Sequence, residues 1–125
     1  MEGMGMSTNV GAFDHTGLMH SLNEGIAPLK KSQPEAMQGF GQLARAAMAE
    51  GSISAKNKEL IALAIGIAQH CSGCIGFHVK ALHKLQCTRT ELDEMLSVSV
   101  YMGGGPALMY AAETIKAWES LAPAA

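Results

Sequence analysis

The sequence predicts an all-α fold for this chain of 125 residues. Hydrophobic residues make up 48% of the chain, but aromatic residues make up only 5%. Ala, Leu, Met and Gly dominate over Val, Tyr and Thr, and this bias favours helices over strands. We expect a single helical domain over residues 13–125. The preceding residues 1–12 are rich in Met, Gly and Ser without periodicity, so we expect a disordered N-terminal arm there.

A first helix is expected over residues 33–50. Pro34 suits the first turn of a helix, and Gly51 suits the position just after its end. Apolar residues recur at helical spacing between these two signals, which indicates an amphipathic helix. The segment that contains His15 and His20 has no clear pattern, so no element is predicted for it.

A second helix is expected to begin after Ser54, a favourable N-cap residue, and to run through the apolar residues 60–68. Nine uninterrupted apolar residues are too few to cross a membrane. A helix that is apolar all round has to be buried on every side, which one small domain can hardly achieve with its own mass. We therefore expect the chain to form a homo-oligomer.

Three further helices follow a short cysteine-containing stretch. Helical spacing of apolar residues continues to about residue 86, and Thr88 with Glu91 then fits the capping box that opens another helix. Residues 103–105 are three consecutive glycines and precede Pro106, which predicts a turn followed by a last helix over PALMYAAETIKAWESL. No internal repeat and no second domain are visible.

The charge balance argues against nucleic acid and anionic membranes as partners. Nine basic and eleven acidic residues are interspersed and give a formal net charge of −2. The first residues do not resemble a signal peptide, so a cytoplasmic location is the default expectation. In that reducing compartment, three cysteines favour metal binding or catalysis over a disulfide framework.

Residues 71–78 read CSGCIGFH and are the main candidate for a functional site. A thiolate is the reactive form of cysteine, so a reactive thiol needs a device that lowers its pKa. A helix that starts near residue 72 would place Cys71 and Cys74 at its N-terminus, where free N–H groups stabilise an anion. His78 lies four residues after Cys74, hence on the same helical face. The CxxC pair itself is a third device, because one sulfur can stabilise and later attack the other.

Glu59 is the candidate partner of His78. On one straight helix the glutamate would lie about 18 Å from Cys71. If the chain reverses near AQHCSG, however, Glu59 and His78 come opposite each other on antiparallel helices. The carboxylate could then orient the imidazole, in the general pattern of nucleophile, base and orienting acid. A carboxylate at the edge of an apolar run also needs a partner, because burying it alone is costly.

Other interpretations of the cysteines remain open at this point. A CxxC followed by His78 also supplies three zinc ligands, which His70, His83 or Cys87 could complete. A purely structural pair of thiols is equally compatible with the spacing. A c-type haem site is excluded, because Ile75 rather than histidine follows the second cysteine. Cys87 is left over with no assigned chemistry.

The joint pattern KEL-IALAIGIA-QHCSGCIGFHVKAL, followed by a T-x-x-E cap and GGGPALMYAAE, resembles the AhpD-like alkylhydroperoxidases of the carboxymuconolactone decarboxylase family. The resemblance covers about residues 35–120. It implies an AhpD-like helical bundle that assembles into trimers or hexamers, with the cysteine pair near a subunit interface. It also implies antioxidant peroxidase and disulfide-reductase chemistry without a metal or a bound cofactor.

The resemblance further implies a role for each residue of the site. The residue matching Cys74 attacks the hydroperoxide and becomes a sulfenic acid, and the one matching Cys71 resolves it as a disulfide. His78 and Glu59 match the proton relay. A dithiol-carrying partner, either a lipoyl protein or a thioredoxin-like reductase, would then restore the thiols.

One position departs from the better-studied peroxidases, which carry a histidine where this chain has Gly73. The chain is also shorter and carries one helical unit, which favours the hexameric arrangement of small relatives. Two alternative functions remain. One is decarboxylase or lactone chemistry that does not need the cysteines, and the other is a non-enzymatic oligomeric scaffold with a structural or zinc-bound CxxC.

Overall fold

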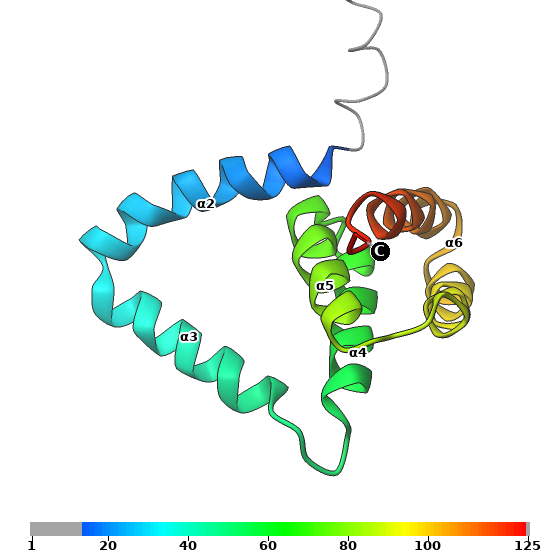
Figure 1. Cartoon of the computed structure of the whole chain (residues 1–125), viewed down its shortest axis with the longest axis horizontal. Helices are drawn as coiled ribbons and strands as arrows, with labels where there is room; N and C mark the ends of the chain where they lie inside the picture. The colour runs from blue at the N-terminus through cyan, green and yellow to red at the C-terminus, as the bar shows by residue number, and fades with distance from the viewer. Residues whose placement is uncertain (1–13, 125) are drawn as a thin grey trace, which may run out of the picture.

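The computed structural model of the chain describes residues 14–124, and every regular element in this range is a helix (Figure 1). In chain order the helices are α2 (His15–Ser32), α3 (Pro34–Met48), α4 (Ala55–Ala68), α5 (Ser72–Lys84) and α6 (Arg89–Ser120). The predicted all-α class is confirmed. The arm expected over residues 1–12 lies outside the described residues. No helix of the described part is both long and apolar enough to cross a membrane.

Helices α4 and α5 form an antiparallel pair, and α6 packs against both (Figure 1). Their facing sides build the hydrophobic core. Its largest fully buried apolar side chains are Leu63, Ile67, Ile75, Val79, Leu82 and Leu92. Each buried aliphatic side chain of this size stabilises the fold by about 1.5–3 kcal/mol relative to full exposure. The core therefore holds α4 and α5 at a fixed register, on which the candidate site depends.

The predicted helix starts are confirmed by their caps. Ser54 Oγ accepts a hydrogen bond from the backbone N–H of Asn57 at 3.1 Å. Thr88 Oγ1 accepts from the N–H of Glu91 at 3.1 Å, and Glu91 Oε1 accepts from the N–H of Thr88 at 2.9 Å. This is the complete capping box, in which each side chain satisfies a backbone donor that the helix leaves free.

The turn predicted at the three glycines appears as a kink inside α6. Gly104 has φ 71° and ψ −150°, a non-helical conformation that is open to glycine. Pro106 follows in the restarted helix, as the sequence predicts. The kink separates α6 into two arms that run in different directions (Figure 1). Both arms can therefore contribute to one core.

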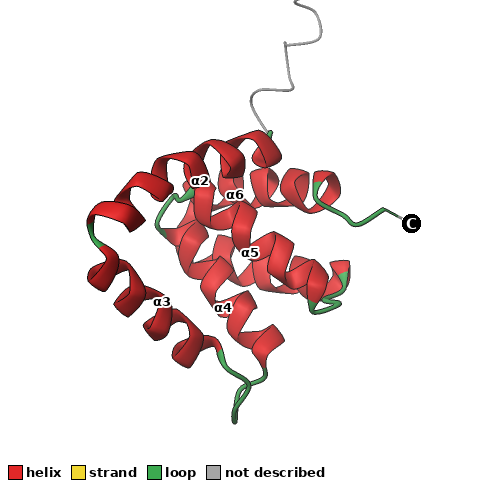
Figure 2. Cartoon of the chain, turned by 60° about the vertical axis from the view of Figure 1, so that its left-hand side comes forward, coloured by secondary structure: helices red, strands yellow, loops and turns green. Residues whose placement is uncertain are grey.

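Helix α2 was not predicted, and the interpretation of the segment that contains His15 and His20 as unpatterned is wrong. Asp14 caps this helix by accepting a hydrogen bond from the N–H of Gly17 at 3.0 Å. Its apolar residues do recur at steps of three and four; they are Met19, Leu22, Ile26 and Leu29. Gly25 and Pro28 lie within this repeat and weaken the helical signal. α2 passes alongside α5, whereas α3 turns away from it (Figure 2).

Candidate functional site

A tight turn between α4 and α5 brings Cys71 to the start of α5. The N–H of Cys71 donates to the carbonyl of Gly66 at 2.9 Å, and the N–H of His70 donates to the carbonyl of Ile67 at 3.1 Å. His70 has a φ of 58°, the left-handed conformation that commonly ends a helix. The predicted reversal of the chain near AQHCSG is thereby confirmed.

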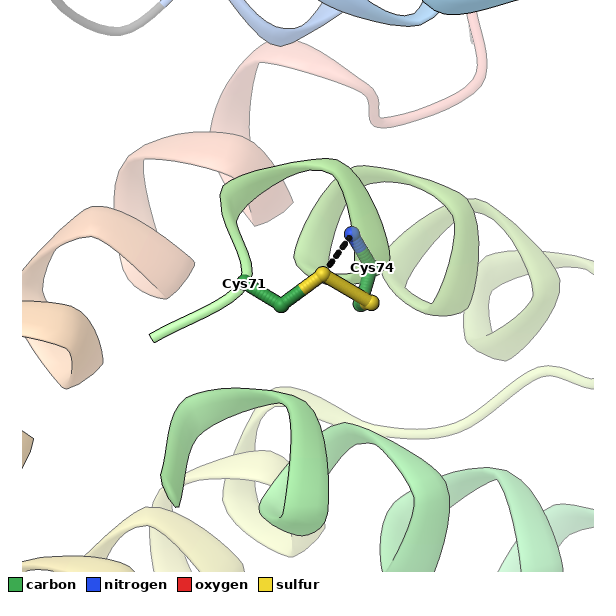
Figure 3. The surroundings of a disulfide bond; sticks show 2 residues. All are labelled: Cys71 and Cys74. Carbon is green, nitrogen blue, oxygen red and sulfur yellow. Dashed lines mark hydrogen bonds between the residues drawn. A yellow bond between two sulfur atoms is a disulfide. The ribbon is translucent and has the colours of Figure 1, made fainter. Parts of the chain in front are cut away.

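Cys71 and Cys74 lie in the first turn of α5 and are joined by a disulfide bond (Figure 3). Their Cα atoms are 5.2 Å apart, within the ordinary range for such a bond. Cys71 is the N-cap of α5, and its Sγ accepts a hydrogen bond from the N–H of Cys74 at 3.1 Å. The same N–H would stabilise a thiolate on Cys71 once the disulfide is reduced.

Gly66 allows α4 to approach the cysteine pair closely. A Cβ added to this glycine would lie 3.2 Å from the Cβ of Cys74, tighter than an ordinary contact. Gly66 on α4 and Cys74 on α5 therefore face each other across the antiparallel pair of helices. This close approach also sets the register in which residues farther along α4 and α5 meet.

Glu59 and His78 form a hydrogen bond across α4 and α5. Glu59 Oε1 lies 2.6 Å from His78 Nδ1, and the two side chains are 15% and 30% exposed. The predicted contact is confirmed. A carboxylate accepts from Nδ1–H, which fixes the orientation and the tautomer of the ring. Nε2 is then the ring nitrogen available for proton exchange with another group.

The four predicted site residues thus come from two adjacent helices. Cys71 and Cys74 lie in one turn, His78 lies one turn farther along α5, and Glu59 reaches it from α4. The arrangement places a two-electron thiol–disulfide couple near a histidine that can carry a proton. Their catalytic roles remain predictions.

The other residues considered as zinc ligands are directed elsewhere. The ring of His70 stacks on that of Tyr110, with centroids 4.8 Å apart. His83 Nε2 lies 2.9 Å from the backbone carbonyl of Trp118, and the two rings are also in contact. Among residues 14–124, no three His, Cys, Asp or Glu side chains are grouped in a way that could hold a metal ion.

Cys87 is separate from the site. It is buried in the core beside the capping box, and burial raises the pKa of its thiol. The neighbouring carboxylate of Glu91 acts in the same direction. A thiol of this kind is poorly ionised near neutral pH and therefore unreactive.

Sequence reasoning missed the contribution of α2, which packs on the first turns of α5. A Cβ added to Gly73 would lie 2.7 Å from Leu22 Cδ1, and one added to Gly76 would lie 2.9 Å from Met19 Sδ. Two glycines three residues apart on one face of a helix indicate a close neighbour there. Combined with the apolar repeat of α2, this spacing is the signal that could have revealed the contact.

A second missed contact ties the start of α2 to α6. His15 is only 2% exposed, and its Nε2 lies 2.9 Å from Glu113 Oε2. A buried imidazole beside a carboxylate resembles the Glu59–His78 pair in chemistry. It lies on a different pair of helices, however, and no cysteine is part of it. We assign it to holding α2 in place.

The fold and this site define a class of protein, namely small helical domains that carry a CxxC pair next to a Glu–His pair. The family model for the carboxymuconolactone decarboxylase family matches residues 34–117, and the chain belongs to this family. A solved structure of a carboxymuconolactone decarboxylase family protein from Legionella pneumophila is similar, with a TM-score of 0.86 and 47% sequence identity. The match covers 88% of this chain and 98% of that one.

Two curated relatives are also similar. An uncharacterized protein of Cupriavidus necator is 36% identical over 100 residues, which are 80% of this chain and 88% of the relative. Uncharacterized protein 4 in the cox locus of Paracoccus denitrificans is 31% identical over 72 residues, or 58% of this chain and 65% of the relative. These names describe the relatives only, and they assign no activity to this chain.

Proposed function

We propose that the protein is a cysteine-based oxidoreductase that reduces organic hydroperoxides or the disulfide of a partner. The observation that carries the proposal is the Cys71–Cys74 disulfide at the start of α5, one turn from the Glu59–His78 pair. A dithiol that cycles through a disulfide needs a stabilised thiolate and a nearby proton carrier. The N–H of Cys74, which donates to Cys71 Sγ, and the Glu59–His78 pair support these two requirements.

In the first step the Cys74 thiolate attacks the terminal oxygen of the hydroperoxide. The S–O bond forms, the O–O bond breaks, and Cys74 is oxidised to a sulfenic acid. The alkoxide leaves and takes a proton from the imidazolium of His78, which yields the alcohol. Glu59 holds the imidazole in place for the transfer.

In the second step Cys71 resolves the sulfenic acid. Its thiolate attacks the sulfur of Cys74, the S–S bond forms, and hydroxide leaves and is protonated to water. This step produces the disulfide. A partner dithiol, on a lipoyl or thioredoxin-like protein, then supplies two electrons and two protons by thiol–disulfide exchange. The reducing conditions of the cytoplasm would keep such a partner in its reduced dithiol form.

Single cysteine variants test this proposal. Cys74→Ser is expected to abolish hydroperoxide turnover, whereas Cys71→Ser should complete one attack and accumulate a sulfenic acid that dimedone traps. Cys87→Ser is the matched control, because this buried thiol belongs to the core rather than the site. Mass spectrometry locates the dimedone adduct residue by residue. Undiminished turnover in Cys74→Ser would refute the assignment.

We also propose that the active form is a homo-oligomer, either a trimer or a hexamer. Within its own chain α4 buries Leu63, Gly66 and Ile67, but Ile61 and Ile65 are 49% and 51% exposed. The apolar run of α4 is therefore only partly covered by the single chain. Burial of these isoleucines against another copy would supply the missing cover, in accord with the expectation from the sequence.

A further inference from the structure

The turn that precedes the cysteine pair contains a residue in the left-handed conformation, His70, with a φ of 58°. Its N–H donates to the carbonyl of Ile67 at 3.1 Å, and the N–H of Cys71 donates to the carbonyl of Gly66 at 2.9 Å. These are the two backbone hydrogen bonds of a Schellman motif, which ends a helix with one left-handed residue. Glycine usually takes that position, because it has no Cβ that opposes a positive φ. A histidine there has a steric cost that glycine would avoid.

The end of α5 contains the same turn without an aromatic partner. Gln86 has a φ of 59°, its N–H donates to the carbonyl of His83 at 3.1 Å, and the N–H of Cys87 donates to that of Leu82 at 3.0 Å. The Gln86 side chain is exposed and makes no hydrogen bond with the rest of residues 14–124. The turn itself therefore forms without a contact that holds the side chain of its left-handed residue.

The two turns differ in what fixes the cysteine that follows each of them. Cys87 is 6% exposed and belongs to the hydrophobic core, which fixes its position. Cys71 is only half-buried, and its covalent bond to Cys74 is lost when the disulfide is reduced. The position of Cys71 in the reduced protein therefore depends on the turn that precedes it.

The ring of Tyr110 connects this turn to the core. The imidazole of His70 lies parallel to it, with an interplanar angle of 3° and ring centroids 4.8 Å apart. Tyr110 lies in the second arm of α6, is half-buried and packs against the core. A stack between two rings is favourable beyond the area that it buries, so it can offset the steric cost of a left-handed histidine.

We propose that Tyr110 is a positioning residue for Cys71 and acts through His70. The stack holds His70 in the left-handed conformation and so directs Cys71 into the N-cap position of α5, where its Sγ accepts from the N–H of Cys74 at 3.1 Å. In the reduced protein the same geometry stabilises the Cys71 thiolate and keeps it beside Cys74. This inference rests on the proposed function, which gives Cys71 the resolving step.

Substitutions at position 70 test the proposal without altering the core, because His70 is exposed. His70→Ala loses the stack but still needs a positive φ. The midpoint of the pH profile of Cys71 alkylation should then rise by about 0.7 pH units, a fivefold loss of thiolate stabilisation. His70→Gly also loses the stack, but glycine adopts the conformation readily and should keep the wild-type midpoint. Mass spectrometry after reduction measures each cysteine separately.

Gln86→Ala is the matched control, because it makes the same change at the other turn and should leave the Cys71 midpoint where it is. A midpoint in His70→Ala that equals the wild-type value overturns the inference. An equal rise in His70→Gly also overturns it, because the imidazole itself, and not the turn, would then act on Cys71.

Variants of the second ring give an independent check. Tyr110→Leu removes the ring and should raise the Cys71 midpoint as much as His70→Ala does. Tyr110→Phe keeps a ring in the same place and should keep the wild-type midpoint. A rise in both variants would assign the effect to the tyrosine hydroxyl and overturn the role of the stack, and so would a rise in neither.

Trapping of the sulfenic acid separates this inference from the proposed function. With hydroperoxide and dimedone present, His70→Ala should accumulate about fivefold more adduct on Cys74 than the wild type, because Cys71 resolves the sulfenic acid more slowly. Equal amounts of adduct would overturn the positioning role. A wild-type protein in which hydroperoxide forms neither adduct nor disulfide would instead refute the proposed function, while the alkylation midpoints would still decide the role of the stack.

Discussion

Glu59 Oε1 lies 2.6 Å from His78 Nδ1, and this hydrogen bond links α4 to α5 one helical turn beyond Cys74. Two residues 19 positions apart are thus held together next to a disulfide. The carboxylate holds the imidazole in one orientation, one helical turn from the cysteine. We therefore expect the position of the imidazole to influence the reactivity of the cysteine.

We predict that Glu59→Gln slows alkylation of the reduced Cys74 thiol near neutral pH about tenfold, because the amide no longer holds the His78 ring in place to take the thiol proton. The measurement is the pH dependence of alkylation, followed for each cysteine by mass spectrometry after reduction.

Glu113→Gln is the matched control for that experiment. It neutralises the carboxylate of the other His–carboxylate pair, which contacts His15 and not the cysteine helix start. Its expected effect is on stability alone. If both variants shift the alkylation profile of Cys74 equally, or if neither does, the positioning role of Glu59 is wrong.

A second prediction concerns acid unfolding. A hydrogen bond from Lys56 at 2.5 Å, and then one from the Thr88 N–H, lower the pKa of Glu91 from an ordinary 4.5 to about 2. The folded state thus binds this proton less readily than the unfolded chain. The resulting stability is fully present above pH 4.5 and is lost as the pH falls toward 2.

Glu91→Gln should therefore flatten the decline of the unfolding free energy between pH 5 and pH 2 while lowering stability near neutral pH. Urea unfolding at a series of pH values measures the decline. Glu94→Gln, at an exposed position of the same helix, should keep the slope of the wild type. The prediction is contradicted if the unfolding free energy of Glu91→Gln declines as steeply between pH 5 and pH 2 as that of the wild type.

The close packing of α2 on α5 predicts a large cost for Gly76→Ala. The added methyl group would lie 2.9 Å from Sδ and 3.1 Å from Cγ of Met19, so this buried side chain or α2 itself has to shift. We expect a loss of about 1–3 kcal/mol in the free energy of unfolding. Chemical denaturation followed by circular dichroism gives the value.

Gly25→Ala on α2 is the corresponding control. No heavy atom lies within 4 Å of the methyl group that it adds, apart from the helix's own neighbouring atoms. Alanine should then stabilise the helix by about 0.5–1 kcal/mol. If Gly76→Ala is no more costly than Gly25→Ala, α2 does not pack on α5 as described.

The proposed oligomer predicts that charge on the exposed side of α4 dissociates it. Ile61→Glu combined with Ile65→Glu should convert the assembly to monomers at low micromolar concentration, with the helical content retained. Sedimentation velocity distinguishes the two states. Gln38→Glu adds one charge at an exposed position of α3 and should leave the assembly intact. A wild-type protein that already sediments as a monomer would end the oligomer proposal.

The sequence by itself determined the helical class, the capping residues Ser54 and Thr88, the helix start at Cys71 and the contact between Glu59 and His78. These features depend on signals within one helix turn or on a single reversal of the chain. Such local signals do not depend on how the rest of the chain folds. The midpoint between Glu59 and His78 falls in the turn, so the antiparallel register follows from counting residues.

Only the tertiary structure decided where α2 lies and where it contacts α5. His15 and Glu113 are 98 residues apart, and Leu22 meets Gly73 across the chain. The physical reason is that a glycine lets another element approach closely because it has no side chain. The missing side chain does not specify which element approaches. The sequence of α5 shows that a neighbour can approach at those glycines, and the tertiary structure shows that this neighbour is α2.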